Sequence, residues 1–162
     1  MNRFMIVVNP DKDTDSTVTN RIQSYLEAHG AACMVRDVFQ LESSDWEALK
    51  KEQFDCVLVL GGDGTLLRMA GETEDIDIPL FGINLGTVGF LTEGEVANIE
   101  EILGRLLTDD FTIEERMMVT GTVTKADGTT YHKSALNDIV ISRAGFSRLI
   151  GLNVSVDGQV LD

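Results

Sequence analysis

The chain has 162 residues, of which 43% are apolar and 25% are charged, and its formal net charge is −14; this size accommodates one sizeable domain, or a small domain and part of another. So acidic a chain argues against nucleic acids and anionic membranes as partners, because both would select a basic surface. No apolar stretch approaches the roughly 18 residues of a membrane span, and none has the form of a signal peptide, so we expect a cytoplasmic protein.

The first sixty residues alternate between strand-like and helix-like patterns. Short apolar runs predict strands, and apolar residues that recur every three or four positions predict helices. The expected order is a strand at 3–9, a helix at 14–29, a strand at 31–37, a helix at 43–53 and a strand at 55–60. Ser44 or Asp45 is expected to cap the second helix. Alternation of this kind predicts a parallel sheet with helices on its faces.

The alternating pattern continues as far as residue 107. The expected elements are a short helix at 66–71, a buried strand at 78–84, a glycine-rich loop at 84–94 and an amphipathic helix at 96–107. All of them extend the same parallel sheet. We therefore predict an α/β fold in which residues 1–108 form a Rossmann-like, parallel-sheet N-terminal domain.

After residue 108 the sequence becomes rich in β-branched residues. Asp127-Gly128 lies between two such runs, which is a strong hairpin signal. Residues 109–162 are therefore expected to begin an antiparallel, β-rich domain. Another turn signal, Asp157-Gly158, is followed by four residues, which we expect to be too few for the returning strand. The second domain is accordingly predicted to be incomplete.

A glycine-rich run interrupts the chain where the strand at 55–60 ends. It contains Gly61, Gly62, Asp63, Gly64 and Thr65. Glycine lets a ligand approach the backbone closely, and successive N–H groups beside a helix N-terminus attract phosphate. The aspartate suits a different task, which is to accept a proton from a hydroxyl or to hold Mg²⁺ between phosphates. This combination indicates transfer of a phosphoryl group to an alcohol.

The same run also has a purely structural interpretation. A Gly-Gly-Asp-Gly sequence can be a simple turn in which Asp63 caps the following helix. The run is not a Walker loop, because no Gly-Lys-Ser or Gly-Lys-Thr follows it. It also lacks the Gly-x-Gly-x-x-Gly pattern of dinucleotide-binding loops. Both interpretations of the run stay open on these residues alone.

Three stretches carry a more specific signal, namely GGDGTLLRMA at 61–70, GINLGTVGFLTE at 82–93 and LNDIVISR at 136–143. In order and spacing they resemble the motifs of the NAD kinase family. The first motif is shared with diacylglycerol-type lipid kinases and, more loosely, with phosphofructokinases. The resemblance implies phosphorylation of the 2′-hydroxyl of the adenosine ribose of NAD, with ATP as donor and Mg²⁺ or another divalent metal as cofactor.

The resemblance assigns roles to residues around the first motif. Asp63 matches the catalytic base of the family, and the neighbouring Gly61, Gly62, Gly64 and Thr65 match the loop that approaches the nucleotides. Leu67 and Arg68 match substrate-binding positions. Arg68 lies one helical turn after Gly64, so its guanidinium could reach back to a phosphate or remain a solvated surface group.

The later motifs match positions that hold the substrate. Phe90 and Leu91 match residues that pack around the adenine, although an aromatic residue here could equally be a core anchor. Asn137 and Asp138 match the Asn-Glu or Asn-Asp pair that holds NAD, and a strand-end pair is the structural alternative. Arg148 matches a position close to the ligand and has an equally good surface interpretation. No residue is assigned as a metal ligand.

Members of the family continue beyond the last motif and carry a further NAD-holding stretch that this sequence lacks. A catalytically silent nucleotide-binding or assembly fragment is therefore one alternative function. A diacylglycerol-type lipid kinase is the other, although the Asn-Glu pair that such kinases place soon after the glycines is missing. The resemblance also implies a homo-oligomer.

Overall fold

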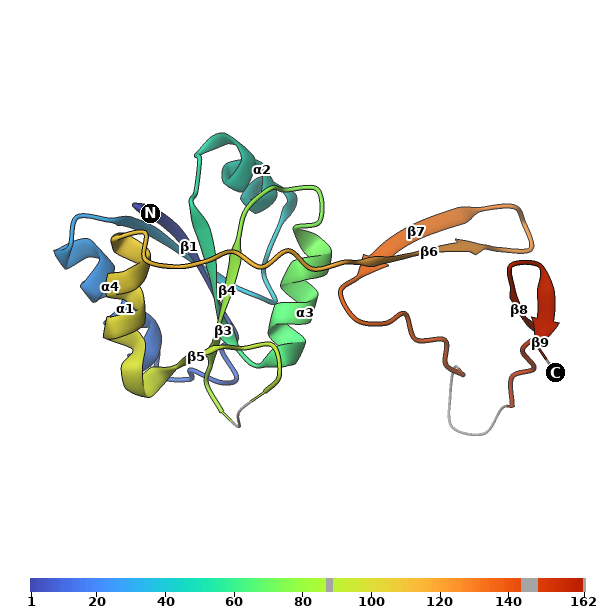
Figure 1. Cartoon of the computed structure of the whole chain (residues 1–162). Coiled ribbons are helices and arrows are strands. Elements are labelled where there is room, and N and C mark those ends of the chain that lie inside the picture. Colours follow the sequence, from blue (N-terminus) through green and yellow to red (C-terminus); the bar gives the residue numbers. More distant parts are fainter. Residues whose placement is uncertain (87–88, 144–148, 162) are drawn as a thin grey trace.

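The computed structural model describes residues 1–86, 89–143 and 149–161. Its centre is a five-stranded parallel sheet in the order β2-β1-β3-β4-β5 (Figure 1). The strands are β1 (Arg3–Val8), β2 (Ala32–Asp37), β3 (Cys56–Gly61), β4 (Leu80–Asn84) and β5 (Gly94–Glu95). The helices are α1 (Thr17–Ala28), α2 (Ser43–Lys51), α3 (Asp63–Glu72) and α4 (Ile99–Leu107). The predicted α/β fold is confirmed.

Successive side chains of a strand point to opposite faces of the sheet, and helices cover both faces. Phe4 and Ile6 of β1 belong to one apolar cluster, which α1 and α4 cover. Met5 and Val7 belong to a second cluster, which α2 and α3 cover. All four side chains are completely buried. Each contributes on the order of 1.5–3 kcal/mol relative to an exposed position, so the two clusters hold the three layers together.

The cap of α2 and the start of α3 differ from the sequence-based expectation. The N-cap of α2 is Glu42, and Asp45 is its capping-box partner, whose Oδ2 accepts a hydrogen bond from the Glu42 N–H at 2.9 Å. The expectation that Ser44 or Asp45 is the cap was therefore wrong. Helix α3 begins at Asp63 rather than at residue 66, because Gly62 has an extended backbone and its carbonyl accepts hydrogen bonds from the following helical turn.

The segment expected as one helix at 96–107 is divided in the structure. Residues Val96–Asn98 form a single 3₁₀ turn, η1, and α4 follows directly. The two-residue strand β5 precedes the turn and pairs in parallel with the end of β4. The sequence analysis missed β5, because two residues cannot show a periodic pattern.

Two antiparallel hairpins follow the sheet and lie apart from it (Figure 1). Strands β6 (Val119–Thr124) and β7 (Thr130–Ala135) form the first, with the expected turn at Asp127-Gly128. Strands β8 (Val154–Val156) and β9 (Gln159–Leu161) form the second. The expectation that the last residues cannot form a returning strand was wrong. Asp157 and Gly158 both have positive φ, which closes a tight two-residue turn.

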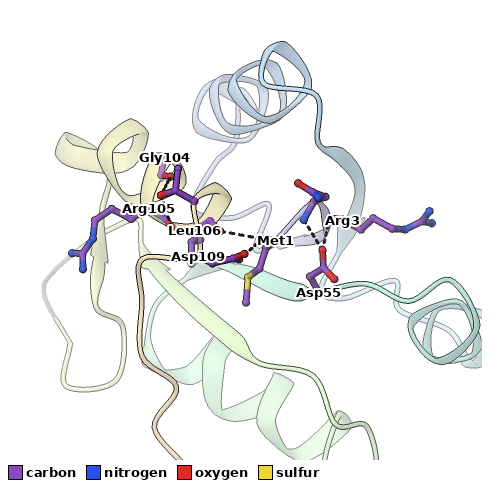
Figure 2. A network of polar contacts seen from close by, with 9 residues as sticks. Met1, Arg3, Asp55, Gly104, Arg105, Leu106 and Asp109 are labelled. Atoms are coloured by element: carbon purple, nitrogen blue, oxygen red, sulfur yellow. Dashed lines mark hydrogen bonds and ion pairs between the residues drawn. The ribbon is translucent and has the colours of Figure 1, made fainter.

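A polar network ties the amino-terminal edge of the sheet to the end of α4 (Figure 2). The Met1 ammonium forms an ion pair with Asp109 Oδ1 at 2.5 Å and donates to the Leu106 carbonyl at 3.3 Å. Asp55 Oδ2 accepts hydrogen bonds from the N–H groups of Asn2 and Arg3. These contacts fix the N-terminus and the start of β1 against the end of α4 and the residue before β3.

Candidate functional site

The site expected from the sequence lies at the carboxyl edge of the sheet. Strands β1 and β3 are neighbours, yet the chain leaves them toward opposite sides, to β2 and to β4. Such a topological switch point leaves a crevice outside the strand ends, where open α/β sheets bind their ligands. Asn9 follows β1 and its N–H donates to the Leu60 carbonyl at 2.9 Å. Gly61 ends β3 at the same place.

The Asp63 carboxylate accepts four hydrogen bonds from the second glycine-rich loop. Oδ2 accepts from the Phe90 N–H at 2.8 Å. Oδ1 accepts from the N–H groups of Leu91 and Thr92 at 3.1 and 3.2 Å, and from the Thr92 hydroxyl at 3.3 Å. The two glycine-rich loops are therefore joined through this one side chain.

These donors change the acidity of Asp63. The N–H of Phe90 holds the pKa of the Asp63 carboxyl below its ordinary value, desolvation opposes this shift, and the donors on Leu91 and Thr92 add to the lowering. Hydrogen bonds to a carboxylate stabilise its ionised form. The carboxylate is accordingly ionised over the whole neutral range and is fixed in orientation.

Two glycines leave room for neighbouring side chains of the site, Gly89 for Asp63 and Gly61 for Thr65. A Cβ built on Gly89 would lie 2.5 Å from Cγ and 2.7 Å from Oδ2 of Asp63, so a side chain at this position would have to displace the carboxylate. A Cβ on Gly61 would lie 2.7 Å from Cβ of Thr65. Thr65 is buried, and its hydroxyl oxygen accepts a weak hydrogen bond from the Asn9 side chain at 3.5 Å. The glycines at these positions are therefore required by packing.

A pocket of about 220 Å³ lies between α3 and the segment 133–138. Leu67 and Arg68 line it from the helix, and Asn137 and Asp138 line it from the end of the segment after β7. The structure thus brings together four of the expected substrate-binding residues, although the two pairs are about seventy residues apart in the sequence. Helix α3 joins this pocket to Asp63, which is its first residue.

Two contacts hold the first hairpin against α3 beside the pocket. A Cβ on Gly71 would lie 3.5 Å from the carbonyl oxygen of Ser134, so the two backbones approach closely. The Lys133 Nζ lies 3.8 Å from Glu72 Oε1. The pocket consequently depends on how the hairpin packs on the helix.

The other expected residues are placed less directly. The Arg68 guanidinium lies over the Phe39 ring, 5.8 Å from its centroid, at an exposed position. The Phe90 side chain is fully exposed, so the structural alternative of a core anchor was wrong for this residue. Leu91 instead packs against the cluster beneath α2 and α3. Arg148 lies outside the described residues.

Sequence reasoning missed the residues that hold Asp63. Gly89 and Thr92 were not singled out, although both stand in the loop that follows a buried strand. The signal available was a glycine immediately before Phe90 and a threonine two residues after it. Such a pattern suits an anion-binding turn, but it does not say which carboxylate the turn receives.

Among the described residues, no group of three or more His, Cys, Asp or Glu side chains is arranged to hold a metal ion. Mg²⁺ often keeps several waters and binds through one or two carboxylates together with nucleotide phosphates. Within the same ranges, none of the helices is long and apolar enough to cross a bilayer.

Fold and site together define a doubly wound α/β protein with its candidate site at the topological switch point. A family model described as the ATP-NAD kinase N-terminal domain matches residues 4–111. The chain therefore belongs to the NAD kinase family.

Relatives extend this similarity over the whole chain. An NAD kinase of Lachnoclostridium phytofermentans is 41% identical over 165 residues, which cover 99% of this chain and 58% of that protein. An NAD kinase of Lachnospira eligens is 38% identical over 167 residues, which cover 100% of this chain and 57% of that protein. The chain thus spans just over half the length of the curated relatives it matches.

One solved structure supports the fold. The crystal structure of yeast NADH kinase complexed with NADH matches with a TM-score of 0.61, covering 85% of this chain and 47% of that one. The sequence identity is 16%, so this likeness concerns the fold alone.

Proposed function

We propose that this chain forms part of an NAD kinase, which transfers the terminal phosphoryl group of ATP to the 2′-hydroxyl of the adenosine ribose of NAD. The family membership and the names of the relatives support this activity.

The observation that carries the proposal is the arrangement around α3. Its first residue, Asp63, presents an ionised carboxylate at the switch point. Leu67 and Arg68, one turn later, face the pocket that Asn137 and Asp138 complete. The same helix thus carries the carboxylate at its start and part of the pocket lining one turn later, which supports their use in one site.

In the proposed step, one bond to the γ-phosphorus forms as another breaks. The 2′-oxygen attacks the γ-phosphorus, an O–P bond forms, and the bond between that phosphorus and the bridging oxygen of ADP breaks. Asp63 accepts the proton of the hydroxyl, and ADP leaves with the electron pair of the broken bond. A divalent cation bound to the phosphates would supply neutralisation of their charge.

We propose that the remaining site residues bind the substrates. Asn137 and Asp138 hold the ribose or the adenine of NAD, because an amide beside a carboxylate can both donate and accept hydrogen bonds. Gly61, Gly62, Gly64 and Thr65 line the approach of the nucleotides. Leu67, Arg68, Phe90, Leu91 and Arg148 complete the substrate-binding set. We further propose a cytoplasmic location, as the sequence pattern indicates, and a homo-oligomer, as the family resemblance implies.

Incubation of the purified chain with NAD, ATP and Mg²⁺, followed by an enzymatic assay for NADP, tests the proposal. A second sample should be a fusion in which the C-terminal part of the Lachnoclostridium phytofermentans relative follows residue 162. NADP formation by the fusion supports the proposal, whether or not the chain alone is active. A folded fusion that binds NAD without forming NADP would indicate a silent nucleotide-binding part, and phosphorylation of diacylglycerol instead of NAD would indicate a lipid kinase.

A further inference from the structure

The two oxygens of the Asp63 carboxylate are used unequally. Oδ1 accepts three hydrogen bonds, from Leu91 and from both donors of Thr92. Oδ2 accepts one, from Phe90. A carboxylate oxygen offers about two acceptor sites. Oδ1 is therefore saturated, whereas Oδ2 retains one acceptor site.

We propose that residues 89–92 are a positioning element for Asp63, which locks Oδ1 and reserves Oδ2 as the atom that receives the substrate proton. This inference rests on the proposed function, because it assumes that Asp63 is the base. Thr92 and Gly89 are positioning residues in it, since they act through Asp63. The hydroxyl proton moves to Oδ2, while the donors at Oδ1 keep their own protons throughout.

Thr92 has two separable contacts, and this makes the proposal testable. Its side chain is buried, with 8% of its surface exposed. The methyl group packs over β4, since a Cβ built on Gly82 would lie 2.9 Å from it. The hydroxyl donates to Asp63 Oδ1 at 3.3 Å. Valine keeps the methyl contact and removes the donor, whereas serine keeps the donor and removes the methyl group.

Gly89 affects Asp63 by leaving room for its carboxylate rather than by a hydrogen bond to it. The volume that a side chain would occupy at this position already contains the Asp63 carboxylate. Gly89→Ala should therefore push the carboxylate away from the donors on Phe90, Leu91 and Thr92. In the same loop, a Cβ on Gly86 would meet its nearest neighbour, Lys12 Nζ, at 3.6 Å, so Gly86→Ala is the matched substitution that leaves the carboxylate in place.

The first experiment uses the 162-residue chain and does not depend on activity. Amide protons that donate to a carboxylate resonate downfield, so Asp63→Asn should move the amide proton signals of Phe90 and Leu91 upfield together. Gly89→Ala should produce the same upfield shift, and Gly86→Ala should not. Unchanged signals in Asp63→Asn would overturn the proposal whatever the function of the protein.

The second experiment measures kinetics in the fusion protein. Thr92→Val should lower kcat about tenfold with the KM for NAD within about twofold, because one hydrogen bond to a charged group is lost. Thr92→Ser should restore kcat to within about threefold of the wild type. Thr73→Val is the matched control: Thr73 is also buried, and its hydroxyl donates to the Met69 carbonyl at the far end of α3.

The outcomes separate the two proposals. A role in packing alone predicts the reverse order, with Thr92→Ser impaired and Thr92→Val normal, and that result would overturn the positioning role while NAD kinase activity stands. Loss of kcat in the Thr73→Val control to the same extent as in Thr92→Val would overturn it too. An inactive wild-type fusion would count against the proposed function alone, and the amide signals would then still decide whether residues 89–92 hold Asp63.

Discussion

Asp63 is both the first residue of α3 and the proposed base of the candidate site. As the first residue of α3, its negative charge lies at the positive end of the helix dipole, which favours the ionised form. The donors of the second glycine-rich loop act in the same direction. A base that is stabilised as an anion gains a fixed orientation and loses some intrinsic basicity, so geometry has to supply much of its effect.

Asp63→Asn should abolish phosphorylation while sparing most of the NAD binding. The amide keeps the shape of the side chain and cannot accept a proton, and loss of a general base typically lowers the rate by ~10²–10⁴-fold. NADP formation by the fusion protein and calorimetric NAD affinity are the two measurements. Near-normal turnover in this variant would remove Asp63 from its proposed role.

The lowered pKa of Asp63 gives a prediction on pH. An aspartate in an unfolded chain has a pKa of about 3.9, and in the folded protein the N–H of Phe90 and its neighbours lower this value. The contribution of the carboxylate to stability is therefore fully present above the unfolded pKa and is lost as the pH falls through the folded one.

The carboxyl carbon resonance of Asp63, followed by NMR against pH, should accordingly have its midpoint below that of a free aspartate. Thr92→Val removes one donor and should move the midpoint upward, whereas Thr92→Ser should leave it close to the wild-type value. A wild-type midpoint at or above the ordinary range would show that the loop does not hold the carboxylate in solution.

At the scale of elements, α3 is the link on which the site depends. It carries Asp63 at its start and packs Gly71, near its end, against the backbone of Ser134 in the first hairpin. Leu66 and Met69 anchor the helix in the buried cluster on one face of the sheet. The helix is thus fixed to the sheet, and the hairpin is positioned by the helix.

Gly71→Val should weaken NAD binding without unfolding the sheet. A Cβ alone fits, at 3.5 Å from the Ser134 carbonyl, but the two further methyl groups of valine must displace β7 or the helix. Gly71→Ala is the control and should change NAD affinity little. The measurements are calorimetric NAD affinity and the melting temperature, and an unchanged affinity in Gly71→Val would show that the hairpin does not position the pocket.

The elements were predictable to the degree that local pattern determines them. The runs that became β1 and β3 are short and almost entirely apolar, which is typical of strands buried on both faces of a parallel sheet. The start of α3 was not predictable from local pattern, because the helix begins within a glycine-rich run that has no apolar periodicity and no side-chain cap. The positions of Asn137 and Asp138 beside α3 depend on long-range packing, and the family resemblance, rather than any periodicity, indicated them.

At the scale of the whole molecule, apolar surface concentrates after the parallel sheet. Val154, Val156 and Leu161, which share one face of the second hairpin, are 48%, 55% and 57% exposed. By contrast, the strands β1 and β3 are almost entirely buried. Exposed apolar strand faces favour association. We propose a domain boundary near residue 108, between a parallel sheet whose strands are buried and a β-rich region whose apolar strand faces are exposed.

We expect the 162-residue chain to associate in solution through the region 112–161 while the parallel sheet stays ordered. Val154 and Val156 lie on one face of β8, so replacing both by lysine should reduce the association measured by light scattering. Ser155→Lys, on the opposite face of the same strand, should have little effect. A monodisperse monomer with strongly protected amide protons across 150–161 would contradict this expectation.

The order of the elements along the chain has a consequence for biosynthesis. Every strand and helix of the parallel sheet lies between Arg3 and Leu107, whereas β7, the strand that closes the pocket, ends at Ala135. Ribosomes add about 5–20 residues per second, and domains generally fold as units in the order of their synthesis. The residues between Leu107 and Ala135 therefore take about 1.5–6 s to synthesise, far longer than elementary folding events. The nascent chain can thus fold the parallel sheet before the hairpin is made, so that the pocket between α3 and residues 133–138 is completed last.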